Sequence, residues 1–255
     1  TDESVGVDRA GRLTPFPKPI SVLQGSHSMF TQFDPGHTGL GAATELAWYL
    51  PASAIRTNSL AHVAEPRLLV FLRHERNAPL EVEDLEPAHA ARLLLSDSAD
   101  SERIGIDGLH IAAHLCARVR CVSMRYGALA PAISAIGTLN RDKPDRSPQV
   151  VPLRFNTEEA HRDTRDRRGF VEPVPALSGC IIDGSCLLRQ PGDGSIVELD
   201  EAGSAWFQLF DGNTSTVDII RDVASAEQLS IAEVEPLAQR MIEALLAAGV
   251  SRIAR

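Results

Sequence analysis

The order of hydrophobic and polar positions divides the chain into two regions with different patterns. In the first region, apolar runs at Pro66–Glu75 and Arg120–Gly127 predict strands. Apolar positions at helical spacing predict helices at Leu85–Leu95, Ile106–Val119 and Ala128–Leu139. Strands separated by helices are typical of an α/β layer with some parallel pairing.

The second region begins with short strands instead. Leu177–Ile182 and Cys186–Gln190 flank the dipeptide Asp183-Gly184, which is a strong signal for a two-residue hairpin turn. A further turn at Pro191–Gly194 leads into a third strand at Ser195–Leu199. The pattern then predicts three strands followed by three helices, a compact α+β arrangement.

The three helices of this region carry recognisable start and stop residues. Ala202, Ala205, Trp206 and Leu209 have helical spacing, and we expect Trp206 and Leu209 to lie in the core. The expected N-caps are Asp200 for the first helix, Ser215 with Asp218 for the second, and Ser230 with Glu233 for the third. Gly212 and Gly249 are expected just after helix ends. In the first region, Asp107 is an expected N-cap.

Polar, proline-marked segments separate the two regions. Residues 140–147 read NRDKPDRS and residues 157–168 read TEEAHRDTRDRR, and both contain few apolar positions. We therefore predict an α/β domain over 1–150, a linker over 151–175, and an α+β domain over 176–255.

Composition removes several classes of function. The chain has 255 residues, a formal net charge of −9 and a sequence pI near 5.4, which disfavours nucleic-acid binding. It contains no apolar run of about 18 residues, so we expect no membrane partner. The first residues lack the basic and apolar regions of a signal peptide, and a start without Met indicates that an upstream part is missing.

The cysteines and histidines do not form a recognisable reactive or metal site. The four cysteines have no C-x-x-C spacing, so we expect reduced thiols and a cytoplasmic protein. His110 and His114 lie one helical turn apart, but the Glu of the H-E-x-x-H motif is absent. We predict no catalytic residue and no cofactor.

The segment "VELDEAGSAWFQLFDGNTSTVDII" together with "LAQRMIEALLAAGV" resembles the PqqD-like peptide chaperones, which share the RiPP recognition element fold. The resemblance covers about residues 176–255. It implies a winged-helix-like domain that binds the leader of a precursor peptide. In that family the leader adds as a strand to the third strand and packs on the third helix.

The resemblance implies a peptide-binding site with two walls. Leader binding would then deliver the core of a precursor peptide to separate peptide-modifying enzymes. The expected residues of the strand are Ser195, Ile196, Val197, Glu198 and Leu199, and those of the helix are Leu237, Arg240, Met241, Ala244 and Leu245. An unpaired strand edge can also pair with a second copy of the chain, so a homodimer stays open.

Residues 1–140 resemble a second family, the HPr-kinase-related proteins with a PEP-carboxykinase-like domain. The segments concerned are "TDESVGVDRAGRLTPFPKPISV", "PRLLVFLRHERNAPLEVEDLEPAHAARLLL" and "LHIAAHLCARVRCVSMRYGALAPAISAI". The resemblance implies that Asp2 and Glu3 belong to a metal-associated acidic motif. The phosphate-binding P-loop of such a kinase is not in this sequence, so we expect an incomplete or degenerate scaffold domain.

Three functions follow from these observations. The leading hypothesis is a non-catalytic recognition protein for modified-peptide biosynthesis. The alternatives are a nucleotide-dependent kinase with a fused peptide-binding domain, whose P-loop would lie upstream, and a winged-helix DNA-binding regulator. The acidic second region disfavours the last of these, because phosphate contacts need Lys and Arg.

Overall fold

The protein has a mixed α/β fold, seen in a computed structural model that describes residues 5–15, 19–55, 63–98, 101–139, 149–153, 155 and 169–254. Two compact units divide the chain, Thr1–Pro66 and Arg67–Arg255. The two polar segments at 140–147 and 157–168 lie outside the described residues. The predicted domain boundaries at 150 and 175 stay a prediction.

The first unit is built from short elements. Strands β1 (Val5–Val7) and β2 (Leu13–Pro15) form a hairpin, and β3 (Ile20–Leu23), β5 (Ala47–Leu50) and β4 (Ala42–Ala43) form an antiparallel sheet in that order. Its helical segments are η1 (Gln24–Met29), η2 (Thr31–Phe33), α1 (Pro35–Thr38) and α2 (Ala52–Ile55). A small core of Val22, Trp48 and Leu50 holds the sheet together.

The second unit begins with a three-stranded sheet in the order β6-β8-β7. Strands β6 (Leu68–His74) and β8 (Arg120–Tyr126) are parallel, which confirms the predicted parallel pairing. The side chains of β6 are half-buried or exposed, although an apolar run of this kind is typical of a buried strand. The sequence pattern missed β7 (Glu81–Asp84), because all four of its side chains are exposed and three of them are acidic.

A four-stranded antiparallel sheet in the order β13-β12-β11-β9 forms the centre of the second unit. Its strands are β9 (Val150–Leu153), β11 (Ser178–Ile182), β12 (Ser185–Arg189) and β13 (Ile196–Leu199). The last three match the predicted strands. β9 comes largely from the segment predicted as a linker, because four residues next to a charged stretch carry little periodic signal.

The other end of the segment predicted as a linker also contains a strand. β10 (Val171–Pro173) pairs with β14 (Ser251–Ile253) near the end of the chain. Arg252 forms an ion pair with the buried Glu172 at 2.7 Å. The residues after the polar segment are therefore held by the last residues of the chain.

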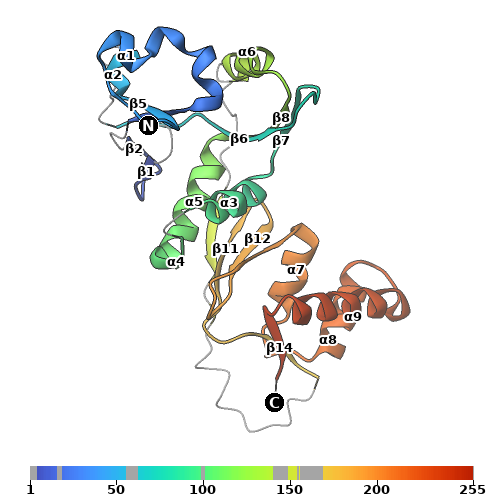
Figure 1. Cartoon of the computed structure of the whole chain (residues 1–255). Coiled ribbons are helices and arrows are strands. Elements are labelled where there is room, and N and C mark those ends of the chain that lie inside the picture. Colours follow the sequence, from blue (N-terminus) through green and yellow to red (C-terminus); the bar gives the residue numbers. More distant parts are fainter. Residues whose placement is uncertain are drawn as a thin grey trace. The chain divides into compact units, whose positions relative to one another are not determined.

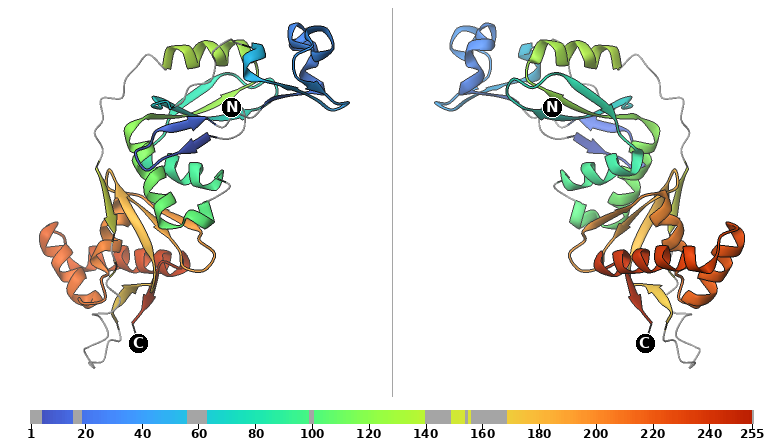
Figure 2. Two further views of the ribbon diagram at one scale, coloured as in Figure 1. Left: turned by 90° about the vertical axis from the view of Figure 1, so that its left-hand side faces the viewer. Right: turned by 90° about the vertical axis from the view of Figure 1, so that its right-hand side faces the viewer.

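Helices cover both faces of the four-stranded sheet (Figure 1). Helices α3 (Pro87–Ser96) and α5 (Ile106–Arg118) pack on one face. Helices α7 (Glu201–Leu209) and α9 (Ile231–Ala247) pack on the other, and α8 (Thr216–Ala226) packs against α9. Both views of Figure 2 show the sheet between these two layers.

The alternation of side chains on the strands explains why both faces need cover. On β12, Cys186 and Leu188 belong to the core on the α7 and α9 side, whereas Leu187 lies on the α3 and α5 side. All three side chains are fully buried. The helices of the first sequence region thus complete the core of the second region. The short α4 (Ser101–Ile104) and α6 (Leu129–Leu139) complete this unit.

The turn and most of the cap predictions are confirmed. Asp183 and Gly184 have φ values of 48° and 86°, as a type I′ hairpin turn requires. Asp200 accepts a hydrogen bond from the backbone N–H of Gly203 at 2.7 Å. Asp107 is a correction, because the helix begins earlier, at Ile106, and Gly105 is its N-cap.

The buried face of α7 differs from the predicted face. Gly203, Ser204 and Phe207 are buried, whereas Leu209 is 41% exposed and Trp206 is half-buried. The small residues at 203 and 204 bring the start of the helix close to the sheet, so that Phe207 can fill the core. The prediction that Leu209 belongs to the core is therefore wrong.

Candidate functional site

β13 is an edge strand of the four-stranded sheet. It pairs with β12 on one side, and within the described ranges no other strand pairs with it. The backbone N–H of Gln190 donates to the carbonyl of Ser195 at 2.9 Å, which makes this a hydrogen-bonded pair. Because such pairs alternate along an antiparallel ladder, Val197 and Leu199 also face β12.

The backbone groups of Ile196 and Glu198 consequently point away from β12. The hairpin gives the same result independently, since its two-residue turn makes Ile182 and Ser185 a hydrogen-bonded pair. The backbone groups of Ser185 face β11. Because the direction alternates along the strand, the backbone groups of Cys186 and Leu188 face β13. Two N–H donors and two carbonyl acceptors of β13 are thus directed outward for an added strand.

A groove of about 500 Å³ lies at the C-terminal end of this edge. It is lined by Arg92 from α3, by Glu198, Leu199 and Asp200 at the end of β13, by Gly203 of α7 and by Met241 of α9. Residues from both helical layers therefore line the groove. Arg92 and Glu198 lie on its α3 side, the Asp200 carboxylate caps α7, and Leu199 and Met241 lie on its α9 side.

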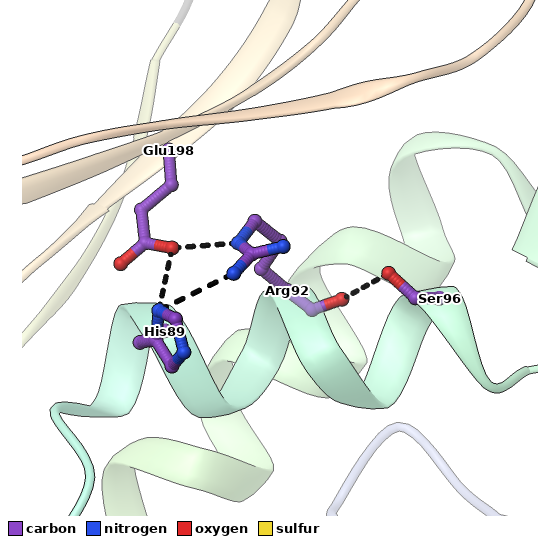
Figure 3. A network of polar contacts seen from close by, with 4 residues as sticks. All are labelled: His89, Arg92, Ser96 and Glu198. Carbon is purple, nitrogen blue, oxygen red and sulfur yellow. Dashed lines mark hydrogen bonds and ion pairs between the residues drawn. The ribbon is translucent and has the colours of Figure 1, made fainter.

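A polar cluster fixes Glu198 on the α3 side of the groove (Figure 3). Its Oε2 atom accepts one hydrogen bond from Nε of Arg92 at 2.7 Å and contacts Nδ1 of His89 at 3.0 Å. The three side chains are 24% to 39% exposed. Figure 3 shows the second carboxylate oxygen of Glu198 turned away from both partners.

The predicted residues of α9 have different environments. Leu237, Arg240 and Ala244 are exposed, and Met241 is half-buried. Their spacing places these four side chains on one face of the helix. Leu245 is fully buried in the core, so it supports this face from inside and does not line the groove.

The start of β13 is anchored by side chains. Ser195 donates its backbone N–H to Oδ1 of Asp193 at 3.0 Å, and this bond lowers the pKa of the Asp193 carboxyl. Its hydroxyl contacts Gln190, whose amide nitrogen donates to the carbonyl of Ala248 after α9. Ser195 therefore links the edge to the end of α9 and presents neither its N–H nor its carbonyl outward.

The sequence patterns brought together Glu198, Leu199 and Met241, which all line the groove. They missed Arg92, His89 and the side of Asp200 that faces the groove. Asp200 carried a signal only as a helix cap, and Gly203 was not predicted. Arg92 lies 106 residues before Glu198, and no local signal could have joined the two.

The other candidate residues of the sequence do not form a metal site within the described ranges. Within them, no group of three or more His, Cys, Asp or Glu residues could hold a metal ion. Asp2 and Glu3, which the kinase resemblance implied, lie outside the described ranges. All four cysteines are free and buried, and burial raises the pKa of both Cys180 and Cys186 to about 12. Among the described helices, none is long and apolar enough to cross a membrane.

Comparisons with known proteins add no relative. No family model matches the sequence, and neither the curated proteins nor the solved structures gave a match.

Proposed function

We propose that this protein recognises the leader of a precursor peptide in modified-peptide biosynthesis by adding the leader as a strand to β13. The observation that carries the proposal is the outward direction of the backbone groups of Ile196 and Glu198 beside a groove. Strand addition uses such groups for affinity and neighbouring side-chain pockets for selectivity. Leu199 and Met241 supply the apolar side of that groove, and the exposed Leu237 lies one helical turn before Met241 on α9.

In this proposal residues 176–255 act as a winged-helix-like recognition element, and the bound peptide is delivered to separate modifying enzymes. α3 and α5 serve as scaffold on the far face of the sheet. The four buried free thiols fit a reducing cytoplasmic compartment. The proposal assigns no catalytic step to residues 1–140, which resemble HPr-kinase-related proteins.

The test removes a backbone donor that an added strand would use and keeps the hydrogen bonds between β13 and β12. Ile196→Pro removes an N–H that points away from β12, so the ladder to β12 stays intact. Ile196→Ala is the matched control, because it shortens the side chain but keeps the N–H. Binding is measured by fluorescence polarisation with the labelled leader of the precursor encoded beside this protein.

We expect Ile196→Pro to weaken leader binding about tenfold or more, and Ile196→Ala to weaken it much less. Circular dichroism and melting temperature verify that both variants are folded. Equal binding by the unmodified chain and a folded Ile196→Pro variant would reject strand addition at β13. No leader binding by the unmodified chain would reject the function itself.

A further inference from the structure

The charge of the protein is distributed unevenly along the chain. Residues 169–254 contain thirteen Asp and Glu residues, four Arg residues and no Lys. The remainder of the chain contains 21 acidic and 21 basic residues. The whole formal excess of −9 therefore lies in the part that forms β11, β12, β13 and α7 to α9. Such a field attracts a basic partner and repels an acidic one.

Acidic residues also outnumber basic residues in the lining of the groove at the β13 edge. Glu198 and Asp200 line it with two carboxylates, against one guanidinium from Arg92. Arg92 is already paired with Oε2 of Glu198, and the other carboxylate oxygen is turned away from it (Figure 3). An approaching cation thus meets a carboxylate whose position is held by two side chains of α3.

The register of β13 determines which residue of an added strand would meet that carboxylate. The residue paired with Glu198 places its side chain on the same face of the sheet as Glu198, which is the α3 face. Its two neighbours in the added strand point to the opposite face. There they meet Val197, Leu199 and Met241, which pack against the apolar core.

We infer that the strand that adds to β13 has the pattern apolar–basic–apolar, with a Lys or Arg residue directly opposite Glu198. This inference rests on the proposed function, because it assumes that a peptide pairs with β13. It goes further by defining the chemistry of the peptide. The basic side chain contacts the free oxygen of Glu198, and the flanking side chains contact Leu199 and Met241.

The test uses synthetic labelled peptides with the full chain. Each peptide has about nine residues, a typical strand length, with Val on both sides of a central Lys, Gln or Glu. We expect the Lys peptide to bind about two- to fivefold more tightly than the Gln peptide, and the Glu peptide to bind most weakly. Raising the salt concentration should reduce these differences.

Two variants assign the effect to Glu198. Glu198→Lys should reverse the order, so that the Glu peptide binds best, which a loss of folding could not produce. Glu227→Gln, at the C-terminal end of α8 and not part of the groove lining, is the matched control and should leave the order unchanged.

The failures of the two proposals can be distinguished. If the three peptides bind equally, or the Glu peptide binds best to the unmodified chain, the basic pattern is wrong while peptide binding stands. If none of them binds but the natural leader does, the apolar–basic–apolar pattern is also overturned. If neither the peptides nor the leader binds, both proposals fail. A light-scattering mass that doubles without peptide would show that a second copy occupies the edge, which also overturns the inference.

Discussion

Helix starts are decided by a few neighbouring residues, and Ser230 with Glu233 is a clear case. The N–H and hydroxyl of Ser230 both donate to Oε2 of Glu233, at 2.8 and 2.7 Å. These hydrogen bonds, first the one from the hydroxyl, lower the pKa of Glu233 below its ordinary value of 4.5. The pair begins α9, the helix that carries Met241.

This cap leads to a prediction about stability and pH. Ser230→Ala should lower the free energy of unfolding by about 1 kcal/mol at neutral pH. The pKa of Glu233 is lower in the folded chain than in the unfolded chain. Its stabilising effect is therefore present above pH 4.5 and is lost as the pH falls through the lowered value.

The difference between Ser230→Ala and the unmodified chain should then shrink as the pH falls below 4.5. Urea unfolding at a series of pH values measures this, with Glu235→Gln on the same helix as the control for a general loss of acidic charge. A difference that does not change with pH would contradict the role given to Glu233.

Residue-scale features of this kind could be predicted from the sequence. The caps at Ser215 and Ser230 and the turn at Asp183-Gly184 depend on residues no more than three positions apart. The cluster of Glu198, His89 and Arg92 could not be predicted, because its members come together only through the packing of α3 on the sheet. The sequence therefore predicted the caps and the turn, but it did not predict the polar side of the groove.

Whole elements were predicted less evenly than single turns. β13 was expected as the last strand of a sheet, and its register now shows that Ile196 and Glu198 carry the outward groups. The position of α7 was predicted but its rotation was not, since Phe207 and not Leu209 fills the core. Apolar residues on more than one face made several rotations compatible with the pattern.

The whole of the second unit depends on contacts between distant parts of the sequence. α3 and α5 cover the sheet face that carries Cys180, Ile182 and Leu187, and all three side chains are fully buried. The sequence pattern assigned these helices and this sheet to different domains. It could not show the shared core, because helix periodicity does not identify the surface on which a helix packs.

A truncation tests this shared core. We expect residues 169–255 alone to aggregate or to bind an apolar dye, because removing α3 and α5 exposes the buried face of the sheet. Residues 67–255 should be monomeric and melt cooperatively. Size-exclusion chromatography and circular dichroism measure both. A folded, monomeric 169–255 fragment with the stability of the longer one would show that the helices are dispensable.

Backbone amide exchange at β13 tests strand addition most directly. In the free chain, the amides of Val197 and Leu199 should exchange slowly, because they face β12, and those of Ile196 and Glu198 should exchange fast. Residue-resolved hydrogen exchange by NMR is then repeated with the leader peptide bound. We predict that Ile196 and Glu198 become protected while Val197 and Leu199 change little. A peptide that binds and leaves Ile196 and Glu198 unprotected would contradict the account.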